Sequence, residues 1–208
     1  MSLTRYLTRC WTRYRSGQPA AGSRQRKAAV IRRVHCLLPA ACCLLPLLMS
    51  PSAQAQQTMI MWAYGPFGTP GDAAYIVEND RIYQACGAYG SRGPCIYVIE
   101  QDRVYHSDAF GRPGICAFTL DGNNLVRAQG SSCMRGSCAL LLEGNKVFRG
   151  EGPFCTKQEG AFFIEPGGGP SPTLVHMAEG PFATKSDALL QVKGPIDTIA
   201  LLTVLAGF

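Results

Sequence analysis

The sequence has few of the residues from which catalytic and metal sites are usually built. It contains 3 histidines in 208 residues, and only 16% of its residues are charged. No two cysteines have the C-x-x-C spacing, and no two histidines have the His-x-x-x-His spacing, that are typical of zinc sites. We therefore expect neither a metal ion nor a cofactor.

Acidic residues are missing from the first third of the chain. None occurs before Asp72, whereas residues 1–33 hold nine of the 20 Lys and Arg residues. The formal net charge of +6 is therefore a property of the N-terminal segment. From Gln56 onward, 11 basic and 14 acidic residues give a net charge of −3. A nucleic-acid-binding domain needs a positive surface of its own, so this distribution argues against a nucleic-acid partner.

No apolar run reaches the roughly 20 residues that a membrane-spanning helix requires. The longest run, residues 34–49, is broken by Pro39 and Pro46 and is followed by an A-x-A motif at residues 53–55. This order is typical of a secretory signal peptide. We predict that residues 1–55 are a basic leader and signal peptide, that cleavage leaves no membrane span, and that the protein is periplasmic or secreted. A retained anchor and an organellar transit segment are the alternatives.

Repetition is what the sequence does contain. The segment AYIVENDRIYQ starts at residue 74, and related segments start at residues 96, 117, 139 and 161. In each of the first four, two apolar runs flank a two-residue loop, which is the pattern of a β-hairpin. Opposite charges flank three of the loops and are expected to attract across the hairpin, by roughly 0.2–1 kcal/mol each. These flanking pairs are Glu78/Arg81, Glu100/Arg103 and Glu143/Lys146.

Each end of the repeat region supplies one more strand. TMIMWAY (58–64) precedes the first hairpin and ALLQV (188–192) follows the last. If these two strands pair, they complete a sixth hairpin and remove the exposed edges of the sheet. We predict an all-β domain, residues 56–193, of five to six β-hairpin repeats of about 22 residues, closed into a ring. An open stack of hairpins is the alternative. Residues 194–208 are an apolar tail that packs on this domain as a strand or short helix.

Six cysteines follow the leader, an even number that suggests disulfide bonds in an exported protein. Three of them precede a hairpin start by one residue, and two precede a start by six. The repeat symmetry then favours two equivalent bridges, and a third is left by elimination among the 15 connectivities. The predicted bridges are Cys116–Cys133, Cys138–Cys155 and Cys86–Cys95.

One position, near the end of the second strand in each of the first four hairpins, carries a polar side chain on a face that is otherwise apolar. In a closed ring these side chains would converge on one rim and could contact an anion, a sugar or a carboxylate. Solvated strand ends are the alternative interpretation. We expect the partner to be a small anionic or glycan ligand, or another envelope protein. The rim residues are Gln84, His106, Arg127 and Arg149.

The run of short hairpins, with Arg-Ile-Tyr at residues 81–83 and Arg-Val-Tyr at 103–105, resembles the bacterial β-hairpin repeat proteins called β-flowers. The resemblance covers about residues 58–192 and implies a compact ring without implying an activity. GPFATKSDALL (180–190) looks like a short piece of the sporulation-related repeat that binds peptidoglycan, which keeps cell-wall glycan among the ligands. We predict a non-enzymatic binding or structural module; the rival hypothesis is a small secreted hydrolase that uses His106 or His176.

Overall fold

The computed structural model describes residues 57–168 and 171–208. The predicted leader and signal peptide, residues 1–55, lie outside the described residues. The elements are β1 (Thr58–Tyr64), β2 (Thr69–Glu78), β3 (Arg81–Cys86), β4 (Ser91–Glu100), β5 (Arg103–Ser107), β6 (Pro113–Asp121), β7 (Asn124–Gln129), β8 (Met134–Glu143), β9 (Lys146–Glu151), β10 (Thr156–Glu165), β11 (Thr173–Glu179), β12 (Thr184–Lys193) and α2 (Thr198–Leu205).

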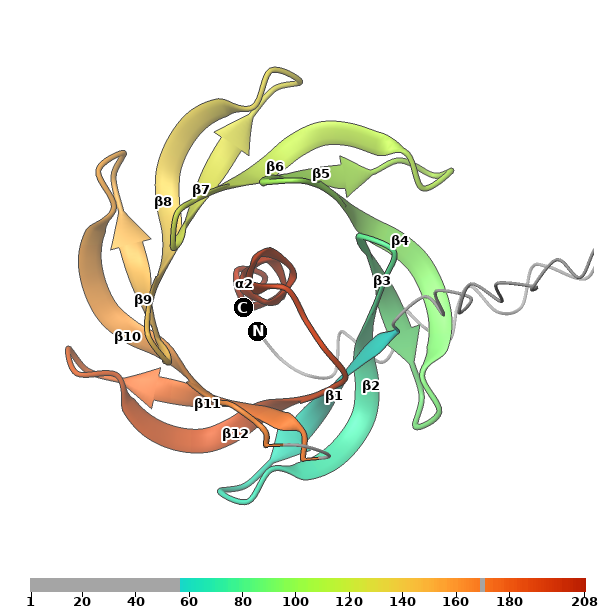
Figure 1. Cartoon of the computed structure of the whole chain (residues 1–208), viewed down its shortest axis with the longest axis vertical. Coiled ribbons are helices and arrows are strands. Elements are labelled where there is room, and N and C mark those ends of the chain that lie inside the picture. Colours follow the sequence, from blue (N-terminus) through green and yellow to red (C-terminus); the bar gives the residue numbers. More distant parts are fainter. Residues whose placement is uncertain (1–56, 169–170) are drawn as a thin grey trace, which may run out of the picture. The chain divides into compact units, whose positions relative to one another are not determined.

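The strands form one closed antiparallel sheet. Each strand pairs with its neighbours in sequence, and β1 pairs with β12 to close the ring. In this last pair, Ile60 lies opposite Val192 and Trp62 lies opposite Leu190. The two ends of the repeat region therefore complete the sixth hairpin, as predicted, and the open stack is excluded. Figure 1 shows the ring from one end, with the hairpins projecting from it.

Two kinds of connection alternate around the ring. Two-residue turns join β2 to β3, β4 to β5, β6 to β7 and β8 to β9. At the first of them, Asn79 and Asp80 have φ angles of 49° and 58°, which this type of hairpin turn requires. The connectors at the outer tips of the hairpins have four residues, or five between β5 and β6, and the fourth residue of each has a positive φ. These fourth residues are Gly68, Gly90, Gly111, Cys133, Cys155 and Ala183.

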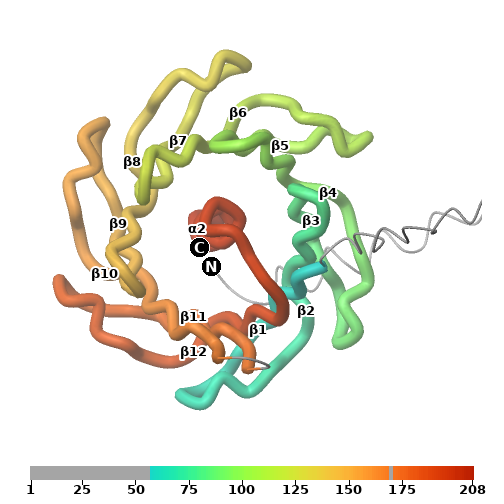
Figure 2. Tube along the Cα trace, in the orientation of Figure 1, coloured from blue at the N-terminus to red at the C-terminus, as the bar shows by residue number. Residues whose placement is uncertain are grey.

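Helix α2 fills the lumen of the ring. Figures 1 and 2 show it inside the circle of strands, and every residue from Ile199 to Leu205 is buried. A helix that is apolar on all sides is stable only when it is surrounded. Here the strands surround the helix, and each odd-numbered strand contributes one inward-facing apolar residue to the core around it. Those residues are Ile60, Ile82, Val104, Leu125, Val147 and Val175, all 0% exposed. The apolar tail thus packs inside the domain.

The outward faces of the strands are also buried, because each hairpin overlaps its neighbour. Val126 packs with Cys138 and Cys155 in one small apolar cluster. Phe148 packs with Ala178 and Ala183 in another. This agrees with the apolar character of both strand faces in the sequence.

The overlap of hairpins changes the expected ion pairs. Glu78 lies opposite Arg81 in the strand register, as predicted, but its carboxylate binds Arg92 of β4, with a nitrogen–oxygen distance of 2.9 Å. Asp121 with Arg135, and Glu143 with Lys157, repeat this arrangement. The predicted register is confirmed for all three pairs, but Glu78 and Glu143 bind a base on the outer strand of the next hairpin instead of the predicted partner. At the Glu100 turn, the equivalent position of that outer strand is Pro113, which supplies no base.

Two of the three predicted disulfides are formed. Cys116–Cys133 and Cys138–Cys155 each tie a strand of one hairpin to the tip connector of the next. The prediction of Cys86–Cys95 is wrong, because Cys95 has a free thiol, which donates a hydrogen bond to the carbonyl oxygen of Tyr97. By ring symmetry, the position that should face Cys95 lies six residues before the next repeat start, which is residue 117. The residue at that position is Gly111, which has no sulfur to offer.

Candidate ligand-binding site

Six equivalent residues lie at one end of the ring lumen. On each odd-numbered strand, the pairing to the following strand skips one residue at the same position, which is a β-bulge. Two residues earlier, each strand carries its buried residue of the core around α2. Side chains two apart share a strand face, so the skipped residues point toward the lumen. We call them the mouth residues: Trp62, Gln84, His106, Arg127, Arg149 and Met177.

Glycines on the partner strands accompany three of these bulges. A β-carbon on Gly136 would lie 2.9 Å from the carbonyl oxygen of Arg127. Gly114 stands in the same relation to His106, at 2.9 Å, and Gly93 to Gln84, at 2.8 Å. Only glycine permits the backbones to approach so closely. Glycine thus permits the bulge at these three strands, whereas Gln158 and Ser186 occupy the equivalent positions beside β9 and β11, where the bulge forms without glycine.

The structure brings the predicted rim residues to equivalent places, as the repeat symmetry required. Sequence analysis missed the two remaining mouth residues, Trp62 and Met177. The signal for them is present, because residues 58–77 align with residues 173–192 at a constant offset of 115. That alignment sets Trp62 against Met177.

The larger of two cavities at the mouth lies between two of the basic mouth residues. It has a volume of about 520 Å³, and His106 and Arg127 line it together with Gln129 and Ser137. Its apolar wall includes Phe118, which pairs with Arg127 across the strands. This volume is in the range of small-molecule sites.

A second cavity, of about 250 Å³, lies between Arg127, Arg149 and the end of α2. The residues that follow the helix, Gly207 and Phe208, form part of its wall. Arg127 therefore lines both cavities. Gln84 lines neither of these two cavities and is half-buried.

The basic mouth residues have no acidic counterpart among the described side chains of the cavity linings. Arg127, Arg149 and His106 are all exposed, and the described residues that line the two cavities include no Asp or Glu. Arginine presents a planar fork of donors that matches a carboxylate or a phosphate. No Asp or Glu side chain in these linings competes with an anion for the guanidinium groups.

His106 is held by an aromatic neighbour and not by a carboxylate. Its ring centroid lies 5.2 Å from that of Tyr97, and burial raises the pKa of the Tyr97 phenol. Asp108, two residues away in sequence, accepts hydrogen bonds from the backbone nitrogens of Phe110 and Arg112, each at 2.8 Å. These bonds hold the pKa of Asp108 below its usual value. Asp108 thus shapes a tip connector, and no His–Asp pair is formed with His106.

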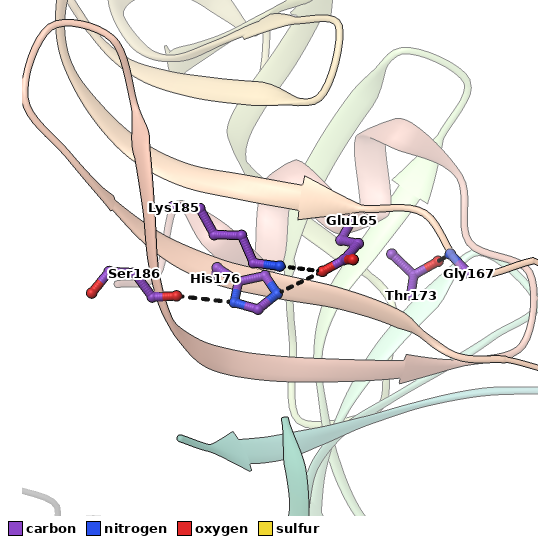
Figure 3. A network of polar contacts seen from close by, with 6 residues as sticks. All are labelled: Glu165, Gly167, Thr173, His176, Lys185 and Ser186. Atoms are coloured by element: carbon purple, nitrogen blue, oxygen red, sulfur yellow. Dashed lines mark hydrogen bonds and ion pairs between the residues drawn. The ribbon is translucent and has the colours of Figure 1, made fainter. Parts of the chain in front are cut away.

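The other histidine among the described residues, His176, belongs to a polar network on the outward face of β11 (Figure 3). Its side chain is 0% exposed. Nδ1 lies 3.1 Å from the carbonyl oxygen of Ser186, and Nε2 lies 3.2 Å from a carboxylate oxygen of Glu165. Both partners can only accept, so both contacts are hydrogen bonds when both ring nitrogens are protonated. His176 offers no free ring nitrogen to a substrate in this arrangement.

Lys185 is the third member of the network and contacts the carboxylate of Glu165. Its Nζ donates a hydrogen bond to Glu165, at 2.5 Å. This bond and the charge of the ammonium hold the pKa of Glu165 below its ordinary value of 4.5, and His176 contributes in the same direction. The network joins three strands, because Glu165 ends β10, His176 lies in β11 and Lys185 lies in β12.

Residues 57–168 and 171–208 contain no group of three or more His, Cys, Asp and Glu residues placed to hold a metal ion. No helix in this part of the chain is long and apolar enough to cross a membrane. Comparisons of the chain with protein-family models, with curated proteins and with solved structures found no match. The geometry of the mouth is therefore the ground for a functional interpretation.

Proposed function

We propose that this protein is an exported, non-enzymatic binding module that holds a small anion at the mouth of its ring. The observation that carries the proposal is the convergence of His106, Arg127 and Arg149 on two adjoining cavities whose described linings contain no acidic side chain. This basic cluster stands out because acidic residues outnumber basic ones from Gln56 onward, by 14 to 11.

The cavities are built on rigid elements, which favours binding over a purely structural role. The mouth residues lie on strands of a closed sheet, and Cys116 in the wall of the larger cavity is bonded to Cys133. A preformed site loses little conformational entropy when it binds.

The two disulfides indicate an oxidising environment. Together with the A-x-A motif that follows the apolar run, they support a periplasmic or extracellular location. In such a location, the anion would be a free small molecule or an acidic group on a cell-wall glycan. Both sources present a carboxylate or a phosphate to the same guanidinium groups.

Isothermal titration calorimetry tests the proposal with phosphate, sulfate, acetate and a uronic acid as ligands. We expect binding of at least one anion that weakens as salt is added. The double variant Arg127→Gln/Arg149→Gln is expected to lower the affinity at least tenfold. Arg103→Gln is the matched control, because this exposed arginine lies on β5 beside the two-residue turn and lines neither cavity. Equal affinities for the double variant and the native protein would falsify the proposal.

A further inference from the structure

The mouth is divided into a basic arc and an apolar arc. Around the ring, the odd-numbered strands follow each other in the order β1, β11, β9, β7, β5 and β3. His106, Arg127 and Arg149 therefore occupy three consecutive places. Met177 and Trp62 occupy the next two. An anion site needs only the first group, so the second group calls for an explanation of its own.

The end of the chain connects the two arcs. The ring of Phe208 packs edge-on against the ring of Trp62, with 5.5 Å between centroids. Phe208 also lines the cavity of about 250 Å³ that Arg127 and Arg149 line. A continuous wall therefore runs from the two guanidinium groups to Phe208 and on to Trp62. Phe208 remains 43% exposed, so apolar surface is open to a ligand along this wall.

We propose that the ligand is an amphipathic anion, in which a carboxylate or phosphate group is attached to a hydrocarbon or aromatic body. The inference deepens the proposed function and rests on it. The charged group binds Arg127 and Arg149, and the apolar body lies against Phe208 and Trp62. Neither half of such a ligand is left unmatched at the mouth.

Ligands of a single character fit less well. A small hydrophilic anion would use the guanidinium groups but would leave the apolar arc in water. A neutral apolar ligand would cover the arc but would strip water from Arg127 and Arg149 without supplying a counter-charge, which is costly. The larger cavity repeats the same combination, since Ile115 and Phe118 stand beside His106 and Arg127.

A series of alkyl carboxylates tests the inference by calorimetry on the purified full chain. Acetate, butanoate, hexanoate and octanoate carry the same charge and differ only in apolar area. We expect the affinity to rise about threefold to fourfold with each added CH₂ that becomes buried. We expect octanol and octyltrimethylammonium, which lack the negative charge, to bind at least tenfold more weakly than octanoate.

Matched variants locate the two halves of the ligand. Arg127→Gln is expected to weaken acetate and octanoate alike, whereas Phe208→Ala is expected to weaken octanoate and leave acetate unchanged. Arg103→Gln and Phe67→Ala serve as controls, because Phe67 is an exposed connector residue that lines neither of the two cavities. Circular dichroism confirms that each variant keeps its β-structure.

The outcomes separate this inference from the function on which it rests. If the affinity depends on Arg127 but does not change with the length of the ligand's alkyl chain, the proposal of an amphipathic ligand is wrong and the proposed anion site still stands. Octanol binding as tightly as octanoate, or octanoate binding unaffected by both Arg127→Gln and Phe208→Ala, would also overturn the amphipathic ligand. Failure of every anion to bind would overturn both proposals.

Discussion

A β-carbon placed on Gly111 lies 4.0 Å from the β-carbon of Cys95. Cysteines in disulfide bonds have their β-carbons about 3.5–4.5 Å apart. Gly111 also has a φ angle of 76°, in the same region as the 52° of Cys133 and the 54° of Cys155 at equivalent connector positions. The ring thus has two bridges of one type and the geometry for a third.

Gly111→Cys is therefore expected to form a disulfide with Cys95. The bridge would close a loop of 16 residues between positions 95 and 111 and raise the free energy of unfolding by roughly 2–4 kcal/mol. Thiol titration and denaturant unfolding, with and without a reductant, measure both effects. Gly111→Ser is the control, since it has the same positive-φ cost without a thiol. The prediction would be contradicted if the thiol of Cys95 and the thiol introduced at position 111 both remained free in the variant.

The native bridges are expected to stabilise the ring without defining it. The double variant Cys138→Ala/Cys155→Ala should lower the free energy of unfolding by roughly 2–4 kcal/mol and keep its β-sheet circular dichroism. The reason is that Gly160 and Ala183 occupy the same two positions one hairpin later and pack there without sulfur. Loss of the β-sheet signal at 25 °C would show that this bridge is needed for folding.

Sequence reasoning was most successful where a property follows from repetition. The spacing of AYIVENDRIYQ and its relatives predicts hairpins, and the unpaired strands at the two ends predict the closed ring. The same symmetry pairs Cys116 with Cys133 and places Arg127 next to Arg149. These results need only the period of the repeat and the alternation of side chains along a strand.

Sequence reasoning failed where contacts depend on how far one hairpin overlaps the next. Glu78 meets Arg92 and not Arg81 because β4 folds over the preceding turn, and no local pattern reports that overlap. Cys95 was paired by elimination with Cys86, although its symmetric counterpart is Gly111. The apolar tail could be recognised, but its place inside the ring depends on a lumen that the strands create together.

Acid should loosen the contact between β10 and β12. The pKa of Glu165 is held below 4.5 by Lys185, so the stability from this contact is present above pH 4.5 and is lost as the pH falls through the lower, folded-state pKa. Thermal unfolding between pH 7 and pH 2 measures the loss. Lys185→Gln should reduce the loss of thermal stability below pH 4.5, whereas Lys193→Gln, at the other end of β12, should leave that loss unchanged. Identical pH profiles for the native protein and Lys185→Gln would refute the assignment.

The two described histidines, His106 and His176, should differ in their effect on stability. His176 is 0% exposed and bonded through both ring nitrogens, at a ring position where β9 carries Phe148. His176→Ala leaves a cavity and an unpaired carbonyl at Ser186, and should lower the free energy of unfolding by about 2–4 kcal/mol.

His176→Phe fills the same space but still leaves the carbonyl without a donor, so a loss of about 1–2 kcal/mol is expected. His106→Ala changes an exposed side chain at the mouth, so its free energy of unfolding should lie within about 0.5 kcal/mol of that of the native protein. Urea unfolding of the three variants gives the comparison. Equal free energies of unfolding for His176→Ala and His106→Ala would mean that the network of Glu165, His176 and Lys185 contributes little to the stability of the protein.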